Sequence, residues 1–551
     1  MAASLAGLSG NQVPSLQDYL RGVEAGVRSG DHAGAMQLAM EAVAAGHEHV
    51  NLFILAAHGA LANAELDQAL VYAERAREMG PRHPDALNVA GLALVKLRRF
   101  REGIEAYDLA LRIVPSAAHL HFNKAQALEE LNETEAARAE YRRMLALDPN
   151  HSDSLARLAN LAVLSGGVAP AREFGERALQ ANPRNVAAAL ALATADIQEG
   201  QFEATLSRLG VLAANAELGL VNFSIAQGLI GDAFDGLART DEAFAAYEAS
   251  NGALRQYYRR AYERADLEPA SARLQRLIAY FETASAEEWR ARPQAGTADF
   301  THVFLVGFPR SGTTLLEQVL AAHPDGETLE ERDCLVKALQ DFIVPQDGLM
   351  RLAALDAAAL ALYREAYWAE AKQYGASRNA RVFVDKLPLN SVLLCLVAKL
   401  FPSARILFAV RDPREVVLSC FRRRFEMNLQ MYELLTLGGA ASYYDGVMHL
   451  SEIYRDKLGL ATHHIRHEDL VRDFDVETRK LCDFLGIAQS GDLKNFADQA
   501  RMKPINTPSA TQVSRGLYSD GMGQWRRYES HLAPVMPILA PWVARFGYAE
   551  S

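Results

Sequence analysis

The sequence predicts an α-solenoid followed by an α/β domain with a central parallel sheet. Two observations lead to this prediction. The first half contains an internal repeat of 34 residues, and the second half contains short β-branched apolar runs that alternate with helix-like segments. At 551 residues the chain is also too long for one ordinary hydrophobic core, so two or more domains are expected.

The repeat is clearest in its prolines and its small residues. Its prolines stand 34 residues apart, at Pro81, Pro115, Pro149 and Pro183. Small residues recur in the same frame, at Ala57, Gly91, Ala125 and Ala159 and again at Ala69, Gly103, Ala137 and Ala171, and the aromatics Tyr107 and Tyr141 match each other. The pattern resembles the tetratricopeptide repeat, in which small residues let two antiparallel helices approach and proline ends the second. We expect about seven such repeats over residues 16–257.

The pattern changes in two steps after the repeats. Residues 258–299 have helical periodicity until Pro293 and Gly296 interrupt it, and they are interpreted as a helical linker. From residue 300 to 551 we expect the α/β domain, with strands in HVFLVGF, RVFVDK, ARILFAVRD and THHIRHEDL.

The composition limits which kinds of partner are expected and indicates the cellular compartment. The net charge is −11, and before residue 300 there are 28 Lys and Arg against 38 Asp and Glu, which argues against nucleic acid as a partner. The four cysteines have no C-x-x-C spacing and are interpreted as core residues rather than disulfides or zinc ligands. Because neither a secretory signal nor a membrane-length apolar run is visible, we expect a cytoplasmic protein.

The segment GFPRSGTT, residues 307–314, has the glycine spacing of a phosphate-binding loop but lacks its lysine. Gly307 and Gly312 are five residues apart, and Thr313 stands where nucleotide triphosphatases carry lysine. A strand precedes the loop and an amphipathic helix begins near Ser311, so unpaired N–H groups at the helix start would face an anion. The loop therefore predicts phosphate binding without the contact that lysine makes with β- and γ-phosphates.

Three segments together resemble sulfotransferases that use 3′-phosphoadenosine 5′-phosphosulfate (PAPS). The loop matches the family's 5′-phosphosulfate loop, which implies cofactor contacts from Pro309, Arg310, Ser311, Gly312, Thr313 and Thr314. The segment ILFAVRDPREVVLSCF matches the second signature, which implies that Arg411 and Ser419 bind the 3′-phosphate. The segment SRGLYSDGMGQWRRYE resembles a basic loop in which Arg515 takes a 3′-phosphate position.

DKLPLN and RHEDLV further resemble the protein-tyrosine sulfotransferase branch and its bacterial relatives with tetratricopeptide repeats. This resemblance implies that Lys386 and Arg310 stabilise charge on the leaving phosphate and that Glu331 is the catalytic base. The neighbouring Glu330 and Glu327 remain alternatives for the base, and His467 stands where relatives often carry tyrosine.

The resemblance implies transfer of a sulfuryl group from PAPS, without a metal, to an acceptor hydroxyl. The acceptor expected from the resemblance is a hydroxyl of a peptide or protein, such as that of tyrosine, or a hydroxyl of a carbohydrate or lipid. The repeats are expected to bind the acceptor or a partner protein. The segment RRR at 422–424 is a 3′-phosphate contact, a guide for an acidic acceptor, or a solvated helix face. Trp525 is either an adenine contact or a core residue. Two other classes stay open: a kinase or nucleotide triphosphatase, and a non-catalytic repeat scaffold with a relic nucleotide-binding domain.

Overall fold

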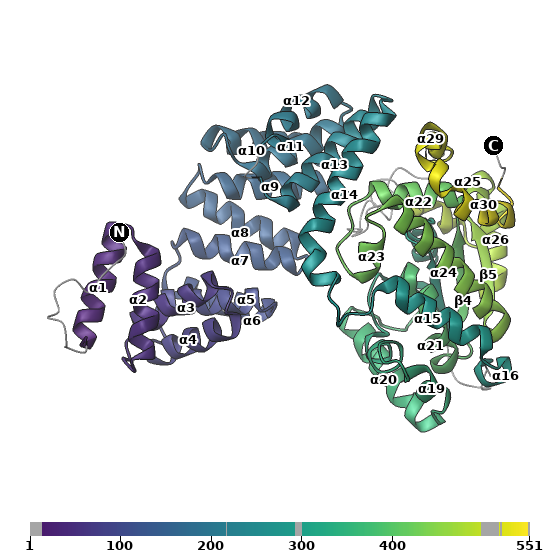
Figure 1. The fold of residues 1–551 in the computed structure, drawn as a ribbon, viewed down its shortest axis with the longest axis horizontal. Helices are drawn as coiled ribbons and strands as arrows, with labels where there is room; N and C mark the ends of the chain where they lie inside the picture. The colour runs from purple at the N-terminus through teal and green to yellow at the C-terminus, as the bar shows by residue number, and fades with distance from the viewer. Residues whose placement is uncertain (1–13, 216–217, 292–299, 498–516, 518–520, 549–551) are drawn as a thin grey trace. The chain divides into compact units, whose positions relative to one another are not determined.

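The structure, a computed structural model, describes residues 14–215, 218–291, 300–497, 517 and 521–548. The chain divides into two compact units, residues 1–199 and residues 200–551 (Figure 1). The first is a helical solenoid and the second contains a parallel sheet, so the predicted fold class is confirmed.

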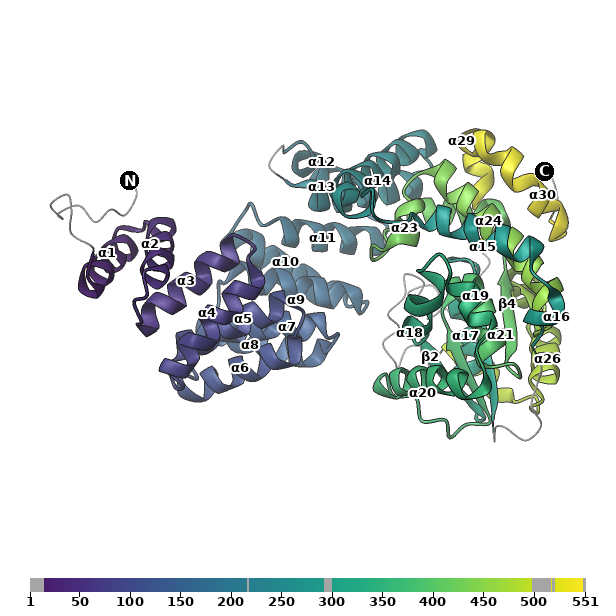
Figure 2. The ribbon, with the colours of Figure 1, turned by 60° about the horizontal axis from the view of Figure 1, so that its bottom comes forward.

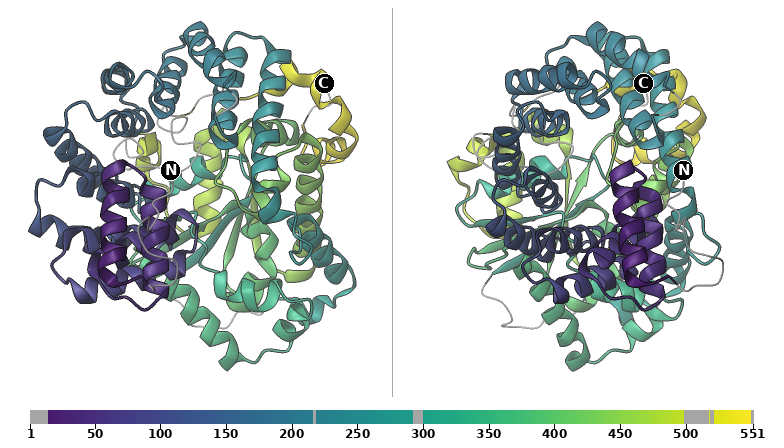
Figure 3. Two further views of the ribbon diagram at one scale, coloured as in Figure 1. Left: turned by 60° about the vertical axis from the view of Figure 1, so that its left-hand side comes forward. Right: turned by 90° about the vertical axis from the view of Figure 1, so that its left-hand side faces the viewer.

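The unit of residues 1–199 consists of helices that pair in order along the chain, and Figure 3 shows the pairs from two further sides. The helices are α1 (Leu16–Ser29), α2 (His32–Ala44), α3 (Val50–Ala62), α4 (Leu66–Met79), α5 (Pro84–Lys96), α6 (Phe100–Ile113), α7 (Ala118–Glu130), α8 (Thr134–Leu147), α9 (Ser152–Leu164), α10 (Val168–Ala181) and α11 (Val186–Gln198).

The repeat frame explains how these helices pack. The four frame prolines each follow the second helix of a pair: α4, α6, α8 or α10. The small residues lie at the helix contacts, where a Cβ added to Gly91 would come within 2.5 Å of the Tyr107 ring. Tyr107 is 1% exposed, so its ring fills the space that the glycine leaves.

The unit of residues 200–551 contains more helices and five strands. The helices are α12 (Phe202–Ala213), α13 (Leu220–Gly236), α14 (Thr240–Tyr262), α15 (Ala270–Thr283), α16 (Ala286–Trp289), α17 (Thr313–Ala321), α18 (Val336–Ala338), α19 (Gly348–Ala353), α20 (Ala357–Gln373), α21 (Leu394–Leu400), α22 (Pro413–Arg422), α23 (Leu429–Glu433), α24 (Leu437–Leu458), α25 (His467–Arg472), α26 (Phe474–Leu485), α29 (Glu529–Leu532) and α30 (Met536–Arg545). Short helical turns are η1 (Leu339–Ile343), η2 (Pro388–Leu393), η3 (Gly491–Asn495), η4 (Gln524–Tyr528) and η5 (Ala533–Val535). The strands are β1 (Thr301–Gly307), β2 (Gly326–Glu330), β3 (Val382–Lys386), β4 (Arg405–Val410) and β5 (Ala461–Arg466).

The sheet is parallel, in the order β2-β3-β1-β4-β5. Successive side chains of a strand point to opposite faces, and in β1 Phe304 and Val306 join one core cluster while Val303 and Leu305 join another. The first cluster includes residues of α15, α21, α22 and α24, and the second includes residues of α17 and α26. Figure 2 labels α15, α17, α21, α24 and α26 in this unit. Coverage of both faces explains why the central strands are continuous apolar runs.

The helices between residue 200 and the sheet belong to the core of this second unit. The rings of Phe244 on α14 and Phe421 on α22 stack with centroids 5.2 Å apart, and Asn251 donates a hydrogen bond of 2.8 Å to the Phe421 carbonyl. Asp235 of α13 forms an ion pair with Arg422 and accepts a hydrogen bond of 2.7 Å from Tyr528. The predicted domain limits of 16–257, 258–299 and 300–551 stay predictions; the compact unit of the structure begins at Gly200.

Two sequence-based expectations concern the whole chain. The four cysteines are free and buried, as expected for core residues. In the part of the chain that the structure describes, no helix has both the length and the apolar character that a membrane crossing requires.

Candidate active site

The loop between β1 and α17 follows the predicted strand, turn and helix. Gly312 caps α17 with φ +99°, and Arg310 also has positive φ, at +72°. A Cβ on Gly312 would lie 2.7 Å from Nδ1 of His467, so both the backbone conformation and the space require glycine. Ser391 on η2 fixes the start of the loop by donating a hydrogen bond of 2.9 Å to the Gly307 carbonyl. The helix begins two residues later than predicted, at Thr313.

Lys386 is the last residue of β3 and contacts two carboxylates. Its Nζ lies 2.8 Å from Oε1 of Glu331 and 3.0 Å from Oε2 of Glu317, and its side chain is fully buried. The Glu331 backbone N–H also donates a 2.8 Å hydrogen bond to the Lys386 carbonyl, so two contacts join these residues. Glu331 adopts φ +37°, which is uncommon for a residue with a side chain.

The two carboxylates differ in their exposure. The Glu317 side chain is 1% exposed, whereas that of Glu331 is 38% exposed. Burial raises the pKa of Glu317 to about 7, although the Lys386 charge acts in the opposite direction. Burial alone would lower the pKa of Lys386, but the charges of Glu317 and Glu331 outweigh it and raise that pKa, so the ammonium stays protonated.

The residues predicted to hold phosphate groups meet around Arg310. Its Nε donates a hydrogen bond of 3.0 Å to Oγ of Ser419, on α22. Arg411, directly after β4, donates to the Arg310 carbonyl at 3.4 Å and also to the Gly521 carbonyl. The Cys420 thiol, also on α22, contacts the Pro309 carbonyl at 3.3 Å, so α22 holds the loop at two points.

Several buried polar atoms beside the loop have no hydrogen-bond partner among the described residues. They are Oγ of Ser311, Nε of Arg411 and Nδ1 of His467. Burial, and then the charges of Arg411 and Arg310, lower the pKa of His467 to about 3, so this ring is neutral. Buried polar groups are normally satisfied, so these atoms indicate a site suited to an oxygen-rich ligand.

A cleft of about 500 Å³ opens beside these residues. The residues that line it include Arg310, Thr313, Thr314 and Glu331, together with residues of α15, η1, η2, α23, α24 and the segment between α22 and α23. Loop, base candidate and cleft thus form one site at the carboxyl ends of the parallel strands, where open α/β sheets bind ligands.

A hydrogen-bonded chain behind Lys386 supports β3. Tyr367 of α20 donates a hydrogen bond of 2.7 Å to the carboxylate of Asp385, and its hydroxyl lies 3.0 Å from Nε2 of His302. Burial raises the pKa of Asp385 to about 7, and burial lowers that of His302 to about 3. Asp385 is fully buried and directly precedes Lys386, so its hydrogen bond from Tyr367 links α20 to the end of β3.

Other sequence candidates lie away from the cleft or outside the described residues. Glu327 accepts hydrogen bonds of 2.5 and 2.9 Å from Ser377 and does not line the cleft. Trp525 is buried, and its ring centroid lies 3.8 Å from the Arg414 guanidinium. This position agrees with the alternative that Trp525 is a core residue. Arg422 pairs with Asp235 in the interior. Arg515 lies outside the described residues.

Glu317 was missed by the sequence prediction. It is the fifth residue of α17, in the apolar stretch TTLLEQVLA, where a helix face against the sheet is expected. The sequence did contain a signal, because Glu317 is a single carboxylate on an apolar helix face. A charge that is buried on such a face almost always has an oppositely charged partner.

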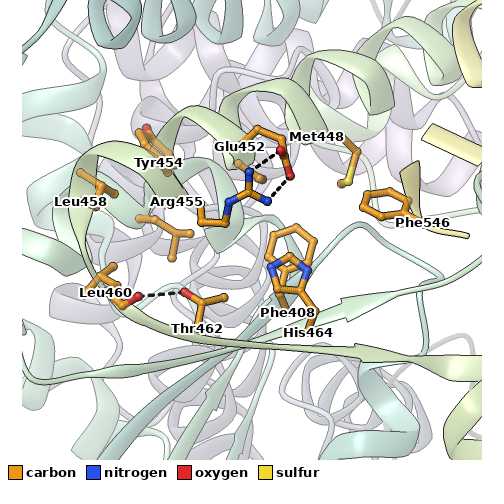
Figure 4. A pocket seen from close by; sticks show the side chains of 12 residues that line it. Phe408, Met448, Glu452, Tyr454, Arg455, Leu458, Leu460, Thr462, His464 and Phe546 are labelled. Atoms are coloured by element: carbon orange, nitrogen blue, oxygen red, sulfur yellow. Dashed lines mark hydrogen bonds and ion pairs between the residues drawn. The ribbon is translucent and has the colours of Figure 1, made fainter. Parts of the chain in front are cut away.

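A second, smaller cavity lies away from the loop, between α24 and strands β4 and β5 (Figure 4). Its volume of about 20 Å³ suits about one water molecule. Phe408, His464 and Tyr454 line it, and Arg455 is paired with Glu452 at 2.7 Å. It shares no lining residue with the cleft.

Comparison with known families agrees with this geometry. Residues 302–491 match the sulfotransferase family, and residues 54–118 and 89–152 match the tetratricopeptide repeat. The second unit contains a sulfotransferase-family domain. The predicted combination of tetratricopeptide repeats with such a domain is therefore confirmed.

Individual relatives of the chain are distant. An uncharacterized Aquifex aeolicus protein is 26% identical over 284 residues, which are 48% of this chain and 35% of that protein. Protein-tyrosine sulfotransferase 1 of Danio rerio is 26% identical over 269 residues, 45% of this chain and 73% of that protein. The chain thus spans about a third of the Aquifex relative. Among solved structures, Pseudomonas aeruginosa PilF has a TM-score of 0.33 at 19% identity and covers 39% of this chain and 92% of its own.

Proposed function

We propose that the second unit transfers a sulfuryl group from PAPS to an acceptor hydroxyl. The observation that carries this proposal is the contact between Lys386 and Glu331 at the mouth of a phosphate-type loop. A buried cation and a partly exposed carboxylate, 2.8 Å apart, supply the two groups that such a transfer needs. The match to the sulfotransferase family and the likeness to protein-tyrosine sulfotransferases support it.

The residues around the loop fit the phosphate groups of this donor. Ser311 Oγ and Arg411 Nε are buried without a hydrogen-bond partner among the described residues, and these two donors and the N–H groups at the start of α17 are suited to phosphate oxygens. Arg310, held by Ser419, would lie beside the phosphosulfate, and Arg411 with Ser419 would hold the 3′-phosphate. The contribution predicted for Arg515, and for Pro309, Gly312, Thr313 and Thr314 through their loop backbone, is part of the same proposal.

Glu331 and Lys386 divide the chemistry. Bound PAPS supplies an activated sulfuryl group. Glu331, exposed in the cleft, takes the proton of the acceptor hydroxyl, while Lys386 and Arg310 donate hydrogen bonds toward the oxygen on which charge develops. Glu317 remains as a buried counter-ion for Lys386 when Glu331 becomes neutral, and so acts as a positioning residue. These groups come from the chain itself, and the proposed mechanism requires no metal.

The acceptor is proposed to be a peptide or protein hydroxyl, with carbohydrate or lipid hydroxyls as alternatives. The name of the Danio rerio relative points to peptidyl tyrosine. The repeats of the first unit are proposed to bind the acceptor or a partner protein, because stacked helix pairs offer extended binding surfaces.

The experiment that tests this function is calorimetric binding of 3′,5′-adenosine bisphosphate, the desulfated product, compared with ADP and Mg²⁺. We expect tight, metal-free binding of the bisphosphate and a loss of about 10- to 100-fold in Arg411→Ala, the size expected for a charge-assisted phosphate contact. Arg479→Ala, which removes an exposed arginine of α26, is the matched control.

Measuring the rate of sulfuryl transfer distinguishes an enzyme from a non-catalytic scaffold. Glu331→Gln should bind the bisphosphate normally but lose about 100-fold or more in sulfuryl transfer. Preference for ADP with Mg²⁺ would identify a nucleotide triphosphatase instead, and binding of neither nucleotide would support the scaffold.

A further inference from the structure

Part of the cleft lining comes from the 425–431 segment, which follows α22 and runs into α23. The residues of this segment that line the cleft are Phe425, Glu426, Asn428, Gln430 and Met431. None of them is among the residues proposed to hold PAPS. Because Glu331 lines the same cleft, an acceptor whose hydroxyl reaches this base enters the space that the 425–431 segment helps to line.

The start of the 425–431 segment packs on α13. Arg424 directly precedes the segment and extends over Gly228 of α13, where an added Cβ would overlap its guanidinium. No hydrogen bond or ion pair within the described residues holds the Arg424 side chain, so the close approach that glycine allows is what places it. Its neighbour Arg422 pairs with Asp235 of the same helix.

The middle and the end of the segment are tied to α14. The Tyr262 hydroxyl donates a hydrogen bond of 3.1 Å to the Met427 carbonyl. The Tyr262 ring also lies 5.4 Å from the ring of Tyr432, which directly follows the segment. Tyr432 in turn donates a hydrogen bond of 2.7 Å to Glu263, directly after α14. Helices α14 and α23 therefore lie side by side (Figure 1).

The residues proposed to hold the nucleotide have other supports. Arg310 is held by Ser419, and the start of the loop is held by Ser391. Arg411 donates to the carbonyls of Arg310 and Gly521. None of these four contacts comes from α13 or α14. Loosening the contacts of these two helices is therefore expected to affect the acceptor side of the cleft and to leave the nucleotide side in place.

Resting on the proposed sulfuryl transfer, we propose that α13 and α14 position the 425–431 segment and thereby set how tightly the acceptor binds. Gly228 and Tyr262 are the positioning residues, and they act through the Arg424 side chain and the Met427 carbonyl. Both helices begin within residues 16–257, the predicted repeat array. Helices of repeat character thus contribute to acceptor binding by packing behind the cleft lining.

Two mild variants test this proposal. Gly228→Ala requires only the end of the flexible Arg424 side chain to move, and alanine favours a helix over glycine. Tyr262→Phe keeps the ring and removes one hydroxyl. The matched controls are Gly252→Ala, with open space around it on α14, and Tyr258→Phe, whose hydroxyl forms no hydrogen bond within the described part of the chain.

The assay uses 4-nitrophenyl sulfate with the full chain and follows transfer in the reverse direction. The bond from sulfur to the phenolic oxygen breaks, a bond forms from sulfur to a 5′-phosphate oxygen of 3′,5′-adenosine bisphosphate, and 4-nitrophenolate leaves and is measured by its absorbance. We expect each variant to raise KM for the aryl sulfate by about 3- to 10-fold, the size of one net hydrogen bond. The values of kcat and the calorimetric affinity for the bisphosphate should stay within about twofold of wild type.

Hydrogen exchange gives a second measurement on the same variants. Exchange in residues 423–431 should become faster by about 3- to 10-fold in Gly228→Ala and Tyr262→Phe, because a contact that resists local opening is lost. Both controls should match the wild-type chain in exchange and in KM.

An unchanged KM in both variants would overturn the proposal, and so would a loss of bisphosphate affinity as large as the rise in KM. Faster exchange without a rise in KM would also overturn it, since the two helices would then have a structural role only. Failure of the proposed sulfuryl transfer has a different signature, because the wild-type chain would then not bind 3′,5′-adenosine bisphosphate. Calorimetry detects that case before any variant is compared.

Discussion

Replacing Lys386 with methionine should lower the free energy of unfolding, because it leaves the buried carboxylate of Glu317 without its cation. Methionine keeps most of the volume of the side chain but removes the ammonium that lies 3.0 Å from Glu317. Glu317 is 1% exposed, so water cannot replace the lost cation. We therefore expect a stability loss that depends on whether Glu317 is ionised.

The magnitude follows from the pKa of Glu317. Burial has already raised this pKa from 4.5 to about 7, and loss of Lys386 removes the charge that opposes the shift. Because the folded pKa lies above the unfolded one, the native state binds the extra proton and stability falls as pH rises from about 4.5 through the folded pKa. Through that window both chains lose the same stability, and the extra cost of the variant grows by about 1.4 kcal/mol for each pH unit above the wild-type folded pKa, where only the wild-type carboxylate is ionised. We expect Lys386→Met to cost about 3 kcal/mol at pH 8 and at most about 1.5 kcal/mol at pH 5.5.

Urea unfolding of the full chain at both pH values measures this difference. The double variant Lys386→Met with Glu317→Gln is the control, since a neutral amide needs no counter-ion and should recover most of the stability at pH 8. Sulfuryl transfer should stay lost in the double variant. Equal losses at both pH values, or no recovery in the double variant, would refute the assignment of a buried ion pair.

Two further predictions concern the loop and the interior of the second unit. Gly312→Ala should lower the free energy of unfolding by about 2 to 4 kcal/mol and weaken bisphosphate binding, because the positive φ of Gly312 and its contact with His467 both disfavour a Cβ. Gly252→Ala on α14 is the control, since the space around Gly252 is open. In the same thermal unfolding assay this control should be neutral or stabilising. Arg422→Met should lower the thermal midpoint of the second unit by leaving Asp235 with fewer partners, yet hardly change bisphosphate affinity; a large loss of affinity would instead favour the hypothesis that Arg422 holds the 3′-phosphate.

Much of the fold was predictable because its signals are periodic. The prolines of the repeat end helices by steric exclusion, and the strands β1, β3 and β4 are buried on both faces, so they appear in the sequence as apolar runs. Strand β2 was missed because GETLE lies at a sheet edge, where a single fully buried residue, Leu329, leaves no apolar pattern.

The site was predictable where the chain itself brings residues together. The phosphate loop is local, so its glycine spacing indicated it directly. Lys386 is the last residue of β3 and Arg411 directly follows β4, and the carboxyl ends of these parallel strands lie at one edge of the sheet. Glu317 and Asp333 were not singled out, because a helix face and a cleft wall are defined by tertiary packing rather than by spacing. The roles of the predicted residues and the cytoplasmic location stay predictions.

The packing of α13 and α14 into the second unit limits how this chain can be recombined. A fusion that exchanged the whole array at residue 258 would discard Asn251 and Phe244, and with them the covering of Phe421 at the end of the helix that carries Ser419. The junction that respects both cores is the short connection between α11 and α12, near Gly200. The helices α13 and α14, which were predicted to continue the repeats, here belong to the interior of the second unit. An exchange of repeats therefore has to keep these two helices with the second unit.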